Sequence, residues 1–127
     1  MFNTTIARVA YPGLIASLVL PLYCQTPAGT ELFEKEIRPV FVAKCYGCHS
    51  SKLKSPMGGL VLDTKAGLKK GGNGGPVIAE GSPASSRLLQ ALTYKQTELR
   101  MPPGGKLPDE KIAAFEKWIA AGAPDPL

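Results

Sequence analysis

The chain of 127 residues is long enough for one small domain and too short for two. Its formal net charge of +5 at pH 7 comes from basic side chains that are spread along the sequence and form no long run. Such a spread does not indicate nucleic-acid binding, which calls for a basic stripe or patch. Glycine and proline are abundant and aromatic residues are few. A domain with so thin a core usually needs a staple, a metal or a cofactor.

Residues 1–24 have the layout of a secretory signal peptide. One basic side chain, Arg8, precedes an apolar stretch that runs to Leu22 and is interrupted by prolines and a glycine. The stretch is short for a membrane span, which needs about 20 apolar residues. We expect cleavage after Cys24, or as late as residue 28, and an exported product in the periplasm or an equivalent compartment. The alternative interpretation is an apolar N-terminus on a cytosolic protein.

The first predicted helix covers residues 30–44, where apolar side chains recur at spacings of three and four. They are Phe33, Ile37, Val40 and Phe41. Thr30 is the predicted N-cap, because its hydroxyl can accept a hydrogen bond from a free backbone N–H of the first turn. Pro39 removes one backbone donor from the helix interior, so we expect a kink or a split there.

The middle of the chain is rich in glycine. Residues 58–72 predict an extended apolar piece followed by a short helix, with Asp63 as its cap and Gly71 as its end. Residues 71–81 form a predicted loop. No lysine–serine pair of a phosphate-binding loop follows these glycines, so a nucleotide site is not indicated.

Two further helices are predicted in the C-terminal part of the chain. The first covers residues 82–92, with Ser82 as cap, Pro83 at the first helical position and a leucine-rich face. Prolines and glycines exclude a helix over residues 97–108. The last helix covers residues 108–122. Its predicted buried stripe consists of Ile112, Phe115, Trp118 and Ile119.

The stretch "CYGCH" at residues 45–49 contains two cysteines three positions apart, followed directly by the only histidine of the chain. A structural zinc site needs four ligands, and only Cys45, Cys48 and His49 are strong candidates once the signal peptide is removed. A thioredoxin-like dithiol needs a strand before the first cysteine, whereas here the pair follows a predicted helix. Neither alternative accounts for the pattern as well as covalent haem attachment does.

Attachment of one haem c explains the cysteine spacing and the export signal together. Two cysteines separated by two residues can reach the two vinyl groups on one edge of a porphyrin, and the imidazole of the next residue can bind the iron. One haem bound covalently through Cys45 and Cys48, with His49 as a ligand, would also supply the apolar plate that the thin core lacks.

The sixth coordination position of such an iron needs another residue type, because His49 is the only histidine. Met57 follows His49 closely and would have to wrap around the ring. Met101 lies beyond two predicted helices and precedes Pro102 and Pro103, which stiffen its loop. We therefore expect His49 and Met101 as the metal ligands, a pair that raises the reduction potential and saturates the iron. The alternative for Met101 is a residue that fills a gap near the core.

Four stretches of the chain together resemble the planctomycete-type cytochrome c domain, a branch of the class I cytochromes c. They are "EIRPVFVAKCYGCHS", "GGLVLDT", "GGPVIAEGSPASSRLL" and "RMPPGGKLPDEKIAAFEKWIAAGA". The resemblance covers about residues 31–124. It implies an all-α fold, a small cytochrome c-like domain of three to five short helices around one covalently bound haem, which we place at residues 30–124.

The same resemblance implies a role for each site residue. Cys45 and Cys48 would form the thioethers, His49 would be the proximal ligand and Met101 the distal one. The first and last helices would cross, with Phe33, Ile37 or Phe41 against Phe115, Trp118 or Ile119. Leu107 stands where a capping residue often precedes the last helix, which we expect to weaken the helix start by about 1 kcal/mol.

The expected function is the transport of single electrons by an exported domain, with no catalytic residue and no nucleic-acid partner. Lys44, Lys52 and Lys54 flank the attachment motif and could steer acidic periplasmic redox proteins toward it. A peripheral membrane partner and the oligomeric state are left open. If Met101 does not bind, an open-site haem enzyme or a gas or redox sensor is the alternative. A haem-stapled interaction module cut from a larger multidomain protein is another, because in the family this domain usually opens a longer chain.

Overall fold

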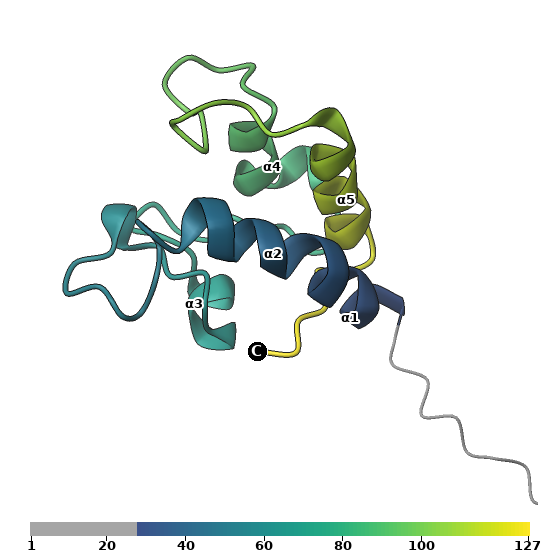
Figure 1. Ribbon diagram of the computed structural model, residues 1–127, viewed down its shortest axis with the longest axis horizontal. Helices are drawn as coiled ribbons and strands as arrows, with labels where there is room; N and C mark the ends of the chain where they lie inside the picture. The colour runs from purple at the N-terminus through teal and green to yellow at the C-terminus, as the bar shows by residue number, and fades with distance from the viewer. Residues whose placement is uncertain (1–27) are drawn as a thin grey trace, which may run out of the picture.

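The computed structural model of the chain describes residues 28–127, so the predicted signal peptide and its cleavage site after Cys24 lie outside the described residues. Short helices and connecting loops make up this part of the chain (Figure 1). Its one β-type pairing is an isolated bridge between Gly72 and Gly75, and it contains no strand. The predicted all-α fold is confirmed. Within residues 28–127, no helix combines the length and the apolar character that crossing a bilayer requires.

The first helical segment contains α1 (Ala28–Leu32) and α2 (Arg38–Val40), each followed by one π-helical stretch. These stretches are Phe33–Ile37 and Phe41–Cys45, and Figure 1 shows the whole segment as one continuous helix. The backbone N–H of Arg38 donates to the carbonyl of Phe33, five residues earlier, so the helix widens just before Pro39. Of the two predicted outcomes, a kink or a split, the split is wrong, because the helix continues through Pro39 with a wider turn before it.

Two of the predicted capping residues have other roles. The first helical segment begins at Ala28, so Thr30 lies inside it and is no N-cap. The N-cap of α3 (Lys65–Lys70) is Thr64, whose hydroxyl accepts a hydrogen bond from the Gly67 N–H at 3.0 Å, and not Asp63. The predicted end of this helix is confirmed, since Gly71 follows it with a φ of 77°, which favours glycine.

The leucine-rich helix is shorter than predicted. A 3₁₀ turn (Pro83–Ser85) comes first, and α4 (Arg87–Leu92) follows with its leucines buried. Ser82 precedes the 3₁₀ turn but makes no side-chain capping bond. The hydroxyl of the fully buried Ser86 instead ties this corner together, accepting from Ala79 N and donating to nearby carbonyls.

The core forms where the first helical segment meets α5 (Asp109–Ala120). The ring centroids of Phe33 and Trp118 lie 5.5 Å apart, and those of Phe41 and Phe115 lie 5.6 Å apart. The side chains of these four residues are at most 1% exposed. The predicted contact between the first and last helices is confirmed. An ion pair from Lys111 Nζ to Glu36 Oε2, 2.7 Å long, joins the same two elements at the rim.

The start of α5 is reinforced in a way that the sequence analysis missed. Leu107 is only 6% exposed and belongs to the same core as Ile112, four positions after the N-cap Pro108. Apolar residues at these two positions correspond to a hydrophobic staple, which fixes the entry of the chain into a helix. The ion pair between Lys106 and Asp109 lies alongside at 2.8 Å. The residue expected to weaken the helix start therefore anchors it in the core.

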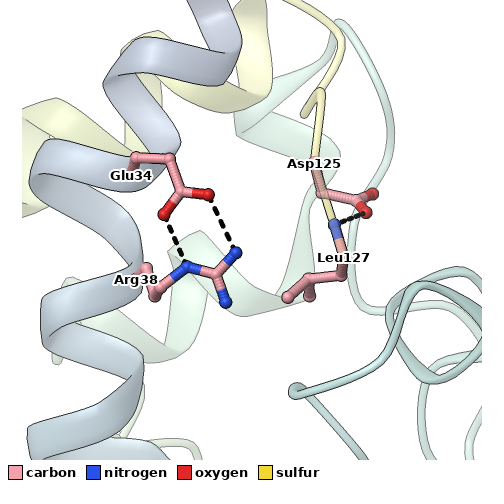
Figure 2. Close-up of polar contacts among 4 residues, drawn as sticks. All are labelled: Glu34, Arg38, Asp125 and Leu127. Carbon is pink, nitrogen blue, oxygen red and sulfur yellow. Dashed lines mark hydrogen bonds and ion pairs between the residues drawn. The ribbon is translucent and has the colours of Figure 1, made fainter.

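The residues after α5 fold back toward the first helical segment, as the yellow trace in Figure 1 shows. Trp118 Nε1 donates to the carbonyl of Pro124 at 2.8 Å, and Leu127 N donates to Asp125 Oδ1 at 3.3 Å. Figure 2 shows this second contact facing the ion pair of Arg38 with Glu34, in which Nε lies 2.6 Å from Oε2.

Candidate functional site

The attachment motif forms a single helical turn at the end of the first helical segment. The N–H groups of Cys48 and His49 both donate to the carbonyl of Cys45, at 3.1 Å and 2.9 Å. Residues three apart on such a turn point to the same side, so both cysteines can face one flat partner. The ring of Tyr46 lies 6.1 Å from that of Phe41 and ties the turn to the aromatic core.

The two thiols differ in exposure but are both free. Cys48 is exposed and Cys45 is partly buried against the core. Burial, followed by the neighbouring Cys48, raises the pKa of the Cys45 thiol to about 11. A thiol that stays protonated at neutral pH is a poor redox nucleophile, because the thiolate is the form that attacks. Residues 28–127 also contain no group of three or more histidine, cysteine, aspartate or glutamate side chains that could hold a metal ion.

The imidazole of His49 contributes a nitrogen that the protein leaves without a partner. Its Nδ1 atom is buried and makes no hydrogen bond. A buried polar atom without a partner costs about 1–3 kcal/mol, which a protein tolerates where a ligand or a function requires it. With two free thiols on the same turn, this donor set fits a haem attached through both sulfurs and bound by one imidazole nitrogen.

The loop that follows His49 is held by the carboxylate of Asp63. Its Oδ2 accepts hydrogen bonds from the hydroxyls of Ser50 at 2.7 Å and Ser51 at 3.0 Å. Its Oδ1 accepts from the backbone N–H of Ser51 at 2.8 Å. One residue earlier, the N–H of Leu62 donates to the carbonyl of His49 at 3.0 Å. We call the side chains of Asp63, Ser50 and Ser51 the serine–aspartate clamp.

The hydrogen bonds within the clamp keep the Asp63 carboxyl group ionised. Partial burial alone would raise the pKa of this carboxyl, but the bonds donated by Ser50 and Ser51 outweigh it, so the pKa lies below its ordinary value of 3.8. The carboxylate is therefore negative at neutral pH and supplies acceptors only. The sequence analysis assigned Asp63 to the wrong role. The serine pair directly after "CYGCH" was a signal for its actual partners.

Met57 lies beside the attachment turn. Its backbone N–H donates to the carbonyl of Cys48 at 2.9 Å, and its side chain is 63% exposed. The next residues interlock with the glycine-rich loop, where Asn73 N donates to the carbonyl of Gly58 at 2.8 Å. Gly59 has a φ of +64°, which favours glycine, and a Cβ atom there would lie 2.2 Å from Asn73 Oδ1, so the Asn73 side chain would have to move. The backbone of Met57 is thus held next to the attachment turn.

Met101 lies in a separate loop, residues 93–108, which joins α4 to α5. In Figure 1 this loop extends from those two helices toward the side where the first helical segment ends. The N–H of Met101 donates to the carbonyl of Ala91 at 3.2 Å, which fixes its backbone at the end of α4. The hydroxyl of Tyr94 donates to the carbonyl of Pro102, the buried residue that follows. The Met101 side chain is 39% exposed.

Cys45, Cys48 and His49 are thus brought together on one turn, and Met101 is presented from a different part of the chain. Residues 45–105 match the sequence model of the family described as Planctomycete cytochrome C. This chain carries a planctomycete-type cytochrome c domain. The match begins at the first cysteine of the motif and ends at residue 105, four residues after Met101, so all four predicted site residues lie inside it. No curated protein and no solved structure gives a significant match.

Membership of the cytochrome c family indicates a haem-binding domain that functions in electron transfer. The helical fold of residues 28–127 agrees with this assignment. Besides the four predicted residues, the site includes Asp63, with its serine partners, and Tyr94. A search of the sequence for haem or metal ligands does not find these residues, because they hydrogen-bond to residues next to the predicted ligands and not to the haem itself.

Proposed function

We propose that the domain carries single electrons through one haem c, attached covalently at Cys45 and Cys48, with His49 and Met101 as axial ligands. The observation that carries the proposal is the single turn on which two free thiols and an imidazole with an unpartnered nitrogen occur together. The haem supplies an iron that alternates between two oxidation states. A histidine–methionine pair favours the reduced state relative to stronger donors and leaves no open position for bond chemistry.

The chain's own contribution is to hold both ligands in place. The clamp and the Leu62 N–H fix the backbone at His49, and the Ala91 carbonyl fixes the backbone at Met101. Ligands that are held before the electron arrives need little rearrangement when it does, which favours fast transfer.

We place the electron exchange with acidic redox proteins in the periplasm or an equivalent exported compartment. The predicted signal peptide supports the location. Lys44, Lys52 and Lys54 are exposed, and none of them belongs to an ion pair within residues 28–127. Unpaired cations around the attachment turn would attract a negative surface and orient the encounter. Association should weaken steeply as ionic strength rises.

A redox titration of the exported protein, made with a haem-maturation system and monitored by its visible spectrum, tests this function. We expect one one-electron transition and a sulfur-to-iron charge-transfer band in the oxidised protein. The reduced protein should not bind carbon monoxide readily. Titration without a reversible transition would contradict the proposal.

An open-site haem sensor or enzyme is the second candidate, and one observation favours it. The Met101 side chain is 39% exposed, and its loop has few hydrogen bonds to the rest of the domain. If the methionine leaves the iron, a gas or small anion could take its position. Stoichiometric carbon monoxide binding by the unmodified reduced protein would select this candidate over the carrier.

A further inference from the structure

We propose that Asp63 is a positioning residue for the proximal histidine, holding the backbone behind His49 so that the ring is fixed when the haem binds. This inference rests on the proposed function, since it assigns a role toward an iron ligand. Asp63 itself would touch neither the haem nor the iron. It would act through Ser50, Ser51 and the adjacent Leu62.

The contacts form a short ladder between two stretches of the chain. The carbonyl of His49 accepts from Leu62 N at 3.0 Å, and the next two residues, Ser50 and Ser51, bind Asp63 through three hydrogen bonds of 2.7–3.0 Å. On its other side, His49 is tied to the carbonyl of Cys45 through its own N–H. Hydrogen bonds thus fix the backbone on both sides of His49, and Asp63 makes the side-chain hydrogen bonds among them.

The clamp is partly shielded from water, which gives its hydrogen bonds more effect. Ser50 is only 5% exposed, and its hydroxyl also accepts from the N–H of Lys52 at 3.1 Å. Hydrogen bonds to an ionised carboxylate are shorter and about twice as strong as neutral ones. Loss of the carboxylate would leave the buried Ser50 hydroxyl without its acceptor, which would destabilise the loop beside His49.

Asp63 is not needed for the local helix, which separates its role from ordinary structural support. Its neighbour Thr64 is the cap of α3 and binds Gly67 N, while the side-chain bonds of Asp63 go to the loop after the attachment motif. Two adjacent polar side chains thus serve different elements. Thr64→Ala is therefore a matched control, since it removes a side-chain hydrogen bond one residue away without touching the clamp.

The variants Asp63→Ala, Asp63→Asn and Thr64→Ala test the proposal in the haem-loaded, full-length protein. The readouts are the midpoint potential and the paramagnetic NMR shifts of the proximal imidazole in the oxidised state. We expect Asp63→Ala to change the imidazole shifts and to raise the midpoint potential, because a negative charge near the iron, which favours the oxidised state, is lost. Asp63→Asn retains the size and one acceptor oxygen, so its imidazole shifts should lie closer to those of the wild type.

Thr64→Ala should lower the unfolding temperature and leave both haem readouts unchanged. The proposal is overturned if Asp63→Ala matches the wild type in both readouts or if Thr64→Ala produces the same imidazole shifts as Asp63→Ala. It also fails if the imidazole shifts of Asp63→Asn lie no nearer to those of the wild type than the imidazole shifts of Asp63→Ala do. A wild-type protein that carries no haem would instead overturn the proposed function, and the role of Asp63 with it. Ser51→Ala, a milder change, replaces Asp63→Ala if that variant does not fold.

Discussion

The two sides of the proposed haem site are built differently. On the proximal side, the carbonyls of His49 and Cys48 accept backbone hydrogen bonds from Leu62 and Met57. The serine–aspartate clamp adds side-chain hydrogen bonds to the same stretch. On the distal side, the loop of residues 93–108 has one backbone bond from Met101 and one side-chain bond from Tyr94 to hold the methionine region. The proximal ligand is therefore fixed by many contacts and the distal ligand by few.

Burial follows the same division. Ser50 and Leu62 are at most 5% exposed. In the distal loop Pro102 and Leu107 are buried, but residues 95–98 and 103–106 are all exposed. Segments with few buried contacts open at low free-energy cost. This difference indicates that the polypeptide orders the attachment turn by itself, whereas Met101, the proposed distal ligand, would complete the site from a looser segment. The predictions below test that division, beginning with the largest expected effect.

Met101→Ala should open the distal side and leave the proximal side intact. We expect loss of the sulfur-to-iron band, a lower midpoint potential and carbon monoxide binding by the reduced protein, with the haem still covalently attached. The visible spectrum and a redox titration measure these changes. Met57→Ala is the control, because Met57 is fixed beside Cys48, and it should retain the band. If Met57→Ala loses the band and Met101→Ala keeps it, the distal assignment is wrong.

Gly59→Ala should damage the proximal side. The new Cβ would meet Asn73 Oδ1 at 2.2 Å, and the residue has a φ of +64°. We expect a loss of about 1–3 kcal/mol in the free energy of unfolding, from backbone strain at this positive φ. Denaturant unfolding measures it.

The matched control for that substitution is Gly74→Ala in the same glycine-rich loop. No atom lies within 4 Å of a Cβ built there. Its stability should stay level or rise by up to about 1 kcal/mol, because alanine restricts the unfolded chain. Equal changes in stability for the two variants would show that the positive φ of Gly59 does not restrict the position to glycine.

Tyr94→Phe should loosen the distal loop alone. The variant removes the hydroxyl that donates to the Pro102 carbonyl, next to Met101. We expect a loss of about 1 kcal/mol in the free energy of unfolding and faster replacement of the methionine by added imidazole. Stopped-flow mixing with imidazole measures the rate. An unchanged rate would mean that this hydrogen bond does not hold the ligand loop.

Acid should weaken the proximal side through Asp63. Because the folded protein holds the pKa of this carboxyl below 3.8, its stabilising effect is complete above that pH. The effect is lost as the pH falls through the lower pKa of the folded state. Denaturant unfolding at a series of pH values should show a decline below about pH 4 that is smaller in Asp63→Asn. Parallel curves for the two proteins would contradict the assignment.

Much of the fold follows from local patterns in the sequence. Spacings of three and four predicted the buried faces of the first and last helices, including Phe33, Phe41, Phe115 and Trp118, because burial of one stripe dominates such short elements. The cysteine–histidine motif predicted that Cys45, Cys48 and His49 act together, and the three residues share one turn. These features depend on residues that are close together in the chain or share one helix face.

Contacts between distant segments were not predictable in the same way. Asp63 lies before a helix and suited a cap, but Thr64 is that cap and the carboxylate pairs with serines twelve and thirteen positions away. Pro39 was expected to kink or split its helix, but the helix continues through it, with a π-helical turn just before the proline. Leu107 was expected to weaken α5 and is buried in the core. In each case the tertiary partner, which no local pattern specifies, decides the outcome.

Intact mass spectrometry of the purified exported protein, with peptide mapping of residues 45–49, tests the central claim most directly. The account predicts the mass of the processed polypeptide plus one haem, with the added mass on the peptide that contains both cysteines. It also predicts that Cys45→Ala combined with Cys48→Ala removes that addition. A protein with the mass of its amino acids alone, after expression with a working haem-maturation system, would contradict the account.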